Sequence, residues 1–188
     1  MLLTIFGKTD YNGVTVADIF HNVNYYYSLI KDDYQLRYYN IKGDLRPEQL
    51  AYEIYGDPNM YWIFFLVNEI TDPFNEWIMS MNNVQETTDY RHQYVGGGDV
   101  IDHHIDDKNR QWFNVVENPV GSKNWYAKDN FGNPDRFVYR GVMNPRTVTE
   151  TNHEANEERR NILIVQPSDA KRFVDSLVSK VELYNGIS

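Results

Sequence analysis

The clearest pattern of hydrophobic and polar positions lies between Tyr38 and Trp77. Residues 37–41 are rich in tyrosine and extended in character, and the turn signal Lys42-Gly43-Asp44 ends them. Two helical patterns and a final extended segment follow within about forty residues. This stretch therefore predicts the order strand, helix, helix, strand.

Both helices of this stretch have recognisable ends. Pro47 fits a first helical turn, because the N–H that proline lacks would have no partner there, and Gly56 ends the helix. One face of this first helix is apolar, comprising Leu50, Ala51, Ile54 and Tyr55. Asp57 then offers a capping carboxylate in front of Pro58. The second helix, residues 58–68, is apolar nearly all round, which is typical of a buried helix.

The flanking sequence predicts an α+β protein of four parts. Residues 1–35 form an N-terminal arm whose helix, 24–34, carries aromatic side chains on one face, and we expect the arm to pack on a neighbouring chain as much as on its own. Residues 36–80 form the two-helix unit. Residues 81–157 form a polar connector with a β-rich insertion, and residues 158–188 form a strand followed by an amphipathic helix.

The insertion and the C-terminal part have their own signals. Short strand candidates are separated by turns rich in Gly, Asn and Asp; they are 112–116, 125–126 and 137–139. Residues 144–156 are polar and predict a flexible linker. A strand over 160–166 precedes a helix that Ser168 is expected to cap. The apolar stripe of this helix, which we expect to dock on this chain or on a partner, comprises Phe173, Val174, Leu177, Val178 and Val181.

Composition narrows the class of protein. A net charge of −9 argues against binding nucleic acid through its phosphates and against docking on an anionic membrane surface. The chain has no cysteine, which excludes disulfides and thiol catalysis. Its longest apolar run, Met60–Val67, is too short to cross a membrane, and the N-terminus lacks the basic leader of a signal peptide. We expect assembly inside the cell, and the 15 tyrosines suit half-wet protein contacts or a small core equally well.

Two groups of residues resemble catalytic or metal-binding chemistry. Carboxylates and imidazoles gather around His103 and His104, but neighbouring strand residues point to opposite faces, so a solvated hairpin is favoured over a metal site. Asp44, Glu48 and Glu53 could mimic a glycosidase pair, although Glu48 is better explained as a complement to the helix dipole. We expect no enzymatic activity, no metal and no cofactor.

The two-helix unit resembles a LysM module, a small domain of the order strand, helix, helix, strand. The residues that carry the resemblance are Tyr39, Gly43-Asp44, Ala51, Tyr55-Gly56, Trp62, Leu66 and Asn68. The small hydroxyl residue that usually follows the Gly-Asp pair is replaced by Leu45-Arg46-Pro47. This departure affects the loop that helps to form the glycan-binding groove in peptidoglycan-binding LysM domains.

The wider order of motifs resembles the small LysM-containing baseplate wedge subunits of T4-like contractile-tailed phages. The motifs are Asp18-Ile19-Phe20, Arg46-Pro47-Glu48, Tyr55-Gly56-Asp57-Pro58, Asp72-Pro73-Phe74 and Val95-Gly96-Gly97. The resemblance spans most of the chain and is weakest between residues 99 and 158.

This resemblance implies a structural protein of the virion, located in the tail baseplate and assembled in the host cytoplasm. It implies that the chain clamps the helical bundle of larger wedge subunits and links neighbouring wedges into a ring, with the sheath-initiating subunit as a further candidate partner. From amphipathicity and family position, the expected partner-binding residues are Tyr39, Arg46, Tyr61, Phe173, Leu177 and Val181. The alternatives are a peptidoglycan-binding LysM module and a metal-dependent hydrolase built around His103 and His104.

Overall fold

A computed structural model describes residues 8–17 and 23–184 of the chain. The chain divides into two compact units. The first unit comprises residues 1–78 and 158–188, and the second unit comprises residues 79–157. Helices and small antiparallel sheets occur throughout the described residues, which confirms the α+β class. The second unit is thus an insertion between two segments that fold together.

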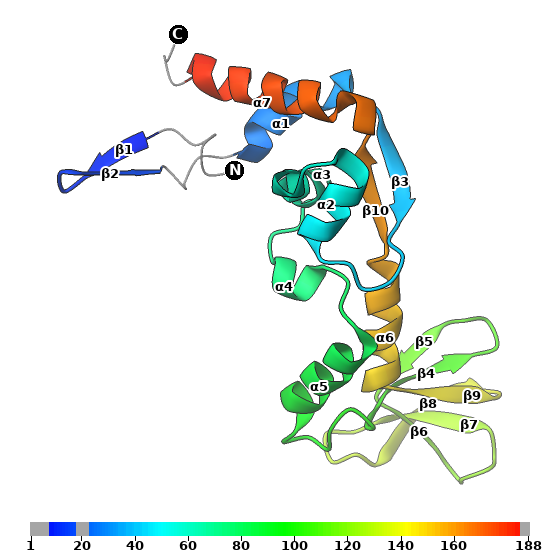
Figure 1. The fold of residues 1–188 in the computed structure, drawn as a ribbon. Helices are drawn as coiled ribbons and strands as arrows, with labels where there is room; N and C mark the ends of the chain where they lie inside the picture. The colour runs from blue at the N-terminus through cyan, green and yellow to red at the C-terminus, as the bar shows by residue number, and fades with distance from the viewer. Residues whose placement is uncertain (1–7, 18–22, 185–188) are drawn as a thin grey trace. The chain divides into compact units, whose positions relative to one another are not determined.

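The sheet of the first unit pairs strands that are far apart in sequence. Strand β3 (Leu36–Asn40) pairs antiparallel with β10 (Asn161–Val165), as Figure 1 shows. In the register of this pair Tyr38 lies opposite Leu163. The strand predicted near Trp77 is wrong: Pro73–Glu76 forms a short helix, α4, instead. The physical reason is an Asp-Pro start signal, because the Asp72 carboxylate accepts a hydrogen bond from the Phe74 N–H at 3.1 Å.

The two predicted helices between these strands are confirmed. Helix α2 (Pro47–Tyr55) ends at Gly56, whose φ of 75° lies in the left-handed region that glycine adopts without strain. The Asp57 carboxylate accepts from the Asn59 N–H at 2.8 Å and so caps the next segment. That segment begins as a 3₁₀ turn, η3 (Pro58–Tyr61), and continues as α3 (Trp62–Val67).

The two faces of the β3–β10 pair cover two different apolar clusters. Alternate strand residues point to opposite faces. On one face Leu36, Leu163 and Val165 contact the "helix cluster", which comprises Tyr26, Ile30, Tyr34, Trp62, Ile63, Leu66, Val67, Val165, Phe173, Leu177 and Val181. On the other face Tyr39 contacts the "sheet cluster", which comprises Ile41, Leu50, Ala51, Phe64, Trp77, Ile78, Ile162 and Ile164. A sheet of only two strands is stabilised because both of its faces are covered.

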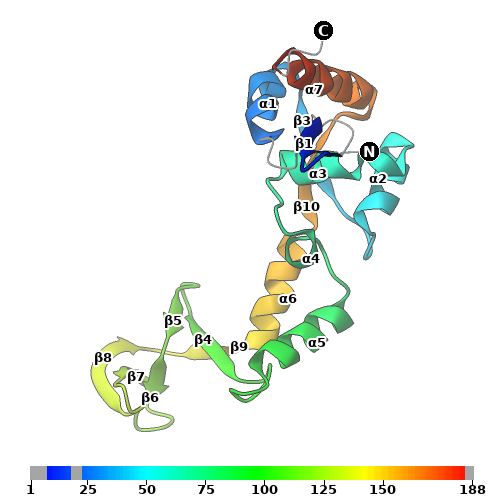
Figure 2. The ribbon, with the colours of Figure 1, turned by 90° about the vertical axis from the view of Figure 1, so that its left-hand side faces the viewer.

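Helices from the two ends of the chain lie side by side in the helix cluster (Figures 1 and 2). They are α1 (Val23–Ile30), followed by the 3₁₀ turn η2 (Lys31–Asp33), and α7 (Ala170–Tyr184). The helical part of the predicted arm therefore packs on its own chain. Strands β1 (Lys8–Tyr11) and β2 (Val14–Ala17) form a hairpin, and the other arm residues, 1–7 and 18–22, lie outside the described residues.

The start of α7 differs from the predicted one. A 3₁₀ turn, η4 (Pro167–Asp169), precedes α7, and Gln166 occupies the N-cap position without a side-chain hydrogen bond. Ser168 therefore lies inside the turn and does not cap it. The preceding strand is confirmed as β10.

The second unit begins and ends with helices that bond to each other through polar side chains. These helices are α5 (Met81–His92) and α6 (Val148–Glu158). Asn152 donates to the Thr88 hydroxyl at 2.9 Å, and Asn156 bonds to both the N–H and the C=O of Met79, each at 2.9 Å. Thr88 and Asn156 are buried, so these polar groups are satisfied within the unit.

The flexible linker predicted at residues 144–156 is wrong. These residues form β9 (Met143–Thr147) and most of α6. A reciprocal cap fixes the start of the helix: Glu150 Oε2 accepts from the Thr147 N–H at 2.9 Å, and Thr147 Oγ1 accepts from the Glu150 N–H at 3.2 Å. Thr-x-x-Glu is a known helix-start signal. The sequence therefore does encode this helix, although its polar composition predicted a linker.

Two three-stranded antiparallel sheets complete the second unit. One has the order β5 (Gln111–Phe113), β4 (Ile101–Asp106), β9; the other has the order β6 (Val115–Glu117), β7 (Asn124–Lys128), β8 (Pro134–Arg140). The strand candidates 125–126 and 137–139 are confirmed as parts of β7 and β8, whereas 112–116 covers parts of two strands, β5 and β6, which Asn114 separates. Strand β4 was not among the candidates. Val115, Trp125 and Met143 form a small core.

Candidate functional site

An acid-lined hollow beside α2 is the candidate docking surface of the first unit. The "α2 hollow" measures about 410 Å³ and is lined by Leu45, Glu48, Gln49, Tyr52, Glu53 and Pro58. Tyr52 is 65% exposed, which is unusual for so large an aromatic side chain. Carboxylates beside an exposed aromatic ring suit a partner that offers both basic and apolar side chains.

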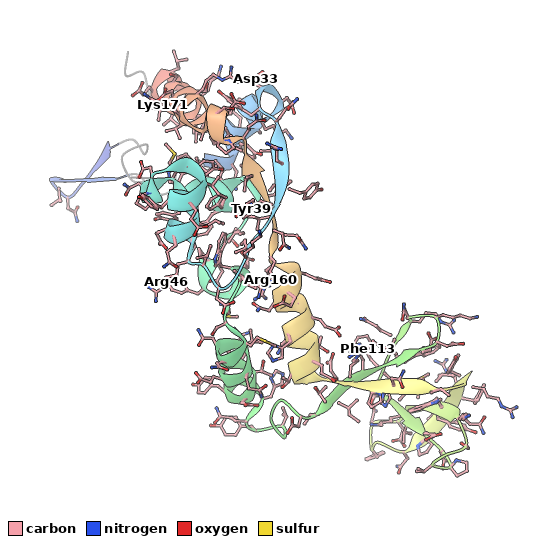
Figure 3. All side chains as sticks on the ribbon, turned by 45° about the vertical axis from the view of Figure 1, so that its right-hand side comes forward. Asp33, Tyr39, Arg46, Phe113, Arg160 and Lys171 are labelled. Carbon is pink, nitrogen blue, oxygen red and sulfur yellow. The ribbon has the colours of Figure 1, made fainter. Side chains whose placement is uncertain are left out.

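The loop before α2 is held in place by hydrogen bonds from three sides. The indole N–H of Trp77 donates to the Leu45 carbonyl at 2.8 Å, and Gln49 Oε1 accepts from the Arg46 N–H at 2.9 Å. Arg160 donates to the Gly43 carbonyl at 2.6 Å and lies 3.6 Å from the Asp44 carboxylate (Figure 3). The α2 hollow is therefore rigid on the side where the loop enters it.

A larger groove runs over the second unit. It measures about 610 Å³, and its walls come from β4, β5, β6 and β7. Apolar side chains dominate the lining, namely Ile101, Phe113, Val115, Val116, Val120 and Trp125. Asp102, Glu117 and Lys128 add charge at its edges. This "β groove" has the mainly apolar character of a protein-binding surface.

His104 forms part of the wall of the β groove. Its ring lies 4.7 Å from the Trp125 ring, measured between centroids. Burial lowers the pKa of the His104 imidazole, and the electrostatic influence of Lys128 and His103 lowers it further. His104 is therefore neutral at pH 7 and contributes an aromatic wall instead of a charge.

The hairpin expected around His103 and His104 is present, because β4 pairs antiparallel with β5, but the expectation that it is solvated is wrong at two positions. His103 and Asp106 are buried. His103 Nδ1 lies 2.8 Å from Asp102 Oδ2, and the His103 ring lies 5.2 Å from the Phe113 ring. The two histidines do diverge as predicted, because β4 alternates its side chains between faces. The turn residues around β4 predicted an exposed segment, whereas two side chains of the strand are buried.

Asp106 organises the turn between β4 and β5. Its carboxylate accepts from the Lys108 and Arg110 N–H groups, each at 2.9 Å, from Arg110 Nε at 2.7 Å and from Trp112 Nε1 at 3.0 Å. Burial alone would raise the pKa of this carboxyl, but the four hydrogen bonds outweigh burial and hold the pKa well below its usual range. The fold of the second unit therefore stabilises the ionised form of the Asp106 carboxyl.

We therefore expect acid to weaken the second unit through Asp106. Because the folded-state pKa is lowered, the stabilisation is present above the unfolded-state pKa of about 3.9 and is lost as the pH falls toward the folded-state value. Replacing Asp106 by asparagine should lower the stability of the second unit at pH 7 and flatten its decline below about pH 4. Hydrogen exchange of the β4 and β9 amides in the full chain measures both effects.

The matched control for this acid effect is Asp135→Asn, which removes a carboxylate from an exposed position of β8. It should leave the exchange of the β4 and β9 amides unchanged at both pH values. An Asp106→Asn chain with the same exchange and the same acid profile as the native chain would contradict the assignment.

The structure separates the residues predicted to bind partners into two groups. Arg46 is exposed, and Tyr39 and Tyr61 are half-buried against the sheet cluster. Figure 3 labels Arg46 and Tyr39. The rings of Tyr61 and Phe65 meet edge to face at 5.5 Å. In sequence Arg46 follows Leu45 and precedes Glu48, and both of these residues line the α2 hollow. These three residues remain candidates for contact with a partner.

The stripe of α7 packs on its own chain. Phe173, Leu177 and Val181 are buried in the helix cluster, so in the folded chain they are not presented to a partner. The stripe predicted the helix correctly, but an apolar stripe by itself does not tell whether the surface that covers it belongs to the same chain.

Sequence reasoning missed the exposed ring of Tyr52 and the β groove. Tyr52 lies one position after Ala51 in a helix whose apolar face was identified, so its place on the opposite face could have been read from the helical period. The β groove combines residues from four short strands. The sequence of any one of these strands does not predict which other strands form the groove with it.

No group of three or more His, Cys, Asp or Glu residues suited to a metal ion occurs within residues 8–17 and 23–184. None of the helices in these ranges has the length and apolar character needed to cross a bilayer.

The described residues thus form two folded units, each with an exposed hollow lined by charged and aromatic side chains. The family described as base plate wedge protein 53 matches residues 1–180, and the chain belongs to this family. The chain is therefore a structural subunit of a phage baseplate wedge. It is 31% identical to the baseplate wedge protein gp53 of Enterobacteria phage T4 over 97% of this chain and 96% of that protein.

Proposed function

We propose that this subunit clamps the helical bundle of the larger wedge subunits and links neighbouring wedges into the baseplate ring. The observation that carries the proposal is the division into two units, each with its own core and its own hollow. A chain of this kind can hold one partner with each unit. Assembly in the host cytoplasm, a contact with the sheath-initiating subunit, and the lack of catalysis and of nucleic-acid or membrane partners belong to the same proposal.

We infer that the first unit is a LysM-like module interrupted by the second unit. The order β3, α2, η3 with α3, and β10 repeats strand, helix, helix, strand, and β10 pairs with β3. In this interpretation the last strand of the module is β10, which comes after the inserted second unit and not directly after α3. The inserted unit then stands where a minimal module would have only a short turn.

The α2 hollow is the surface that we assign to the helical bundle. Its two carboxylates, Glu48 and Glu53, are exposed and flank the exposed Tyr52 ring. Tyrosine is enriched among the residues that dominate binding energy, and its ring can contact the apolar stem of a lysine or arginine. A helix with basic and apolar side chains on one face would complement this surface.

Reversing the two carboxylates should weaken binding to the wedge. The double variant Glu48→Lys/Glu53→Lys is expected to bind a wedge assembly reconstituted without this chain at least about tenfold more weakly, because like charges would face each other. The matched control is Asp175→Lys/Glu182→Lys, which makes the same charge change at exposed positions of α7. Equal binding of the two variants, measured by analytical ultracentrifugation, would contradict the assignment of the α2 hollow.

The β groove is the surface that we assign to the neighbouring wedge. Its mainly apolar lining and its exposed Phe113 and Val120 resemble the centre of an interface. Cryo-electron microscopy of intact tails from the phage that encodes this chain tests the whole proposal. Density for the chain between adjacent wedges is the expected result, and absence of the chain from the baseplate would overturn it.

A further inference from the structure

The two edges of the β3–β10 pair differ in a way that the proposed function leaves unexplained. Each residue of an antiparallel strand directs its N–H and C=O to the same side, and successive residues alternate sides. Groups directed away from the partner strand need another partner or water. The outer edges of β3 and β10 can therefore be compared group by group.

The outer edge of β10 is closed by a side chain. Asn68 Oδ1 accepts from the Leu163 N–H at 2.7 Å, and Asn68 Nδ2 donates to the Leu163 carbonyl at 2.8 Å. The same amide also donates to the Phe64 carbonyl at 2.8 Å, which fixes Asn68 at the end of α3. The side-chain amide of Asn68 thus makes the two hydrogen bonds that the backbone of a neighbouring strand residue would make.

The outer edge of β3 is open. The backbone N–H and C=O of Leu163 point away from β3. Its opposite residue, Tyr38, must therefore direct its own N–H and C=O away from β10. Leu36 and Asn40 follow the same alternation. No hydrogen bond joins these outward backbone groups to any other part of residues 8–17 and 23–184. Tyr38, in the middle of this strand, is 86% exposed.

The open edge also carries unpaired positive charge. Arg37 and Lys42 are exposed, and neither forms an ion pair with another described residue. A second copy of β3, Leu-Arg-Tyr-Tyr-Asn, contains no carboxylate and could not complement these cations. The backbone groups require an extended segment, and the charges favour an acidic one.

We propose that β3 accepts an additional strand from another wedge subunit, an extended segment with an acidic side chain beside Arg37. The added strand bonds to the outward backbone groups of Leu36, Tyr38 and Asn40 and turns the two-stranded sheet into a three-stranded one. This inference rests on the proposed function, because it names the kind of contact that the first unit makes in the wedge. Exposed strand edges are ordinarily protected in natural proteins, and within residues 8–17 and 23–184 only one of the two edges is protected.

The variant Tyr38→Pro tests the open edge. Proline lacks the outward N–H, but at this position no bond to β10 is lost, since Tyr38 and Leu163 are not a hydrogen-bonded pair. The variant should keep its fold and bind the reconstituted wedge assembly at least about tenfold more weakly, because an edge proline blocks strand addition. Tyr38→Thr is the matched control: it also removes the ring, keeps the N–H and should bind within about twofold of the native chain.

Amide hydrogen exchange gives a second measurement that requires no variant. In the free native chain the Tyr38 and Asn40 amides should exchange fast, while the Arg37 and Tyr39 amides, which face β10, should exchange slowly. Binding to the wedge assembly should protect Tyr38 and Asn40. Unchanged exchange of these two amides in the bound chain would overturn the inference, whether or not Tyr38→Pro folds.

The outcomes separate this inference from the function on which it rests. If the native chain does not bind the wedge assembly at all, the proposed function fails. If the native chain and Tyr38→Pro bind equally, or if protection arises in the free chain through self-association, strand addition by a wedge subunit fails while the proposed function stands.

Discussion

Replacing Phe173 by alanine is expected to destabilise the first unit by about 3–5 kcal/mol, the range for deleting a large aromatic side chain from a packed core. Phe173 is fully buried, and its ring meets the rings of Tyr34 and Tyr27 edge to face at 5.2 and 6.0 Å. The side chain joins α7 to α1, so the cavity would form where the two ends of the chain meet. A change of this size is a large fraction of the stability of an ordinary domain.

The matched control for Phe173→Ala is Leu183→Ala in the same helix. Leu183 is 71% exposed, and its truncation should change stability by less than about 0.5 kcal/mol. Urea unfolding of the full chain, followed by hydrogen exchange of α1 and α7 amides, measures both variants. A Phe173→Ala chain whose α1 amides remain as protected as those of Leu183→Ala would refute the central position of this ring.

Replacing Asn156 by alanine should destabilise the second unit by about 2–4 kcal/mol, because it leaves two backbone groups of Met79 without their partner. The Asn156 side chain is 1% exposed and makes both of its hydrogen bonds to Met79 at 2.9 Å. Water has little access to take over these bonds. The loss should appear as faster exchange of amides in α5 and α6 of the full chain, with α7 unchanged.

Asn82→Ala is the corresponding control, since it truncates an exposed amide on α5. Exchange in α5 and α6 should then stay within the range of the native chain. Equal effects of Asn82→Ala and Asn156→Ala would show that the paired bonds to Met79 contribute nothing particular.

Elements with local start and stop signals could be predicted from the sequence. Helix α2 has Pro47 at its start and Gly56 at its end, and both signals act through the backbone of the residue itself. Strand β10 and helix α7 followed in the same way from a β-branched run and an apolar stripe. The general class of protein also followed, because the motifs that carry the resemblance lie in these locally encoded elements.

Features that depend on distant pairing could not be predicted. Nothing near Asn40 indicates that its opposite residue is Asn161, and a strand was therefore expected at Trp77, where Asp72 starts a helix instead. Polar composition also misled twice. It suggested a linker where Thr147 and Glu150 start α6, and a solvated hairpin where Asp106 is buried.

The candidate site was predicted only in part. Arg46 was singled out and lies next to Leu45, which lines the α2 hollow, but the exposed ring of Tyr52 was not predicted, because the hydrophobic pattern marks only the buried face of the helix. The α7 stripe was expected to dock on this chain or on a partner. Phe173, Leu177 and Val181 were also offered as partner-binding residues, although the chain itself buries them. The open edge of β3 depends on which residues of β10 face Asn68, and this is a property of pairing that one strand does not encode.

The insertion of the second unit sets an order in which the newly made chain can fold. The residues of the second unit are all synthesised before β10, whereas β3 must wait for a partner 121 residues away. Bringing such distant ends together is entropically unfavourable for an open chain. Once the second unit has folded, however, the bonds between Met79 and Asn156 hold its two ends together, and the long gap becomes a short one. The folded second unit then favours the pairing of β10 with β3, because it brings the two strands closer along the chain. The sheet of the first unit would become complete only after β10 has left the ribosome.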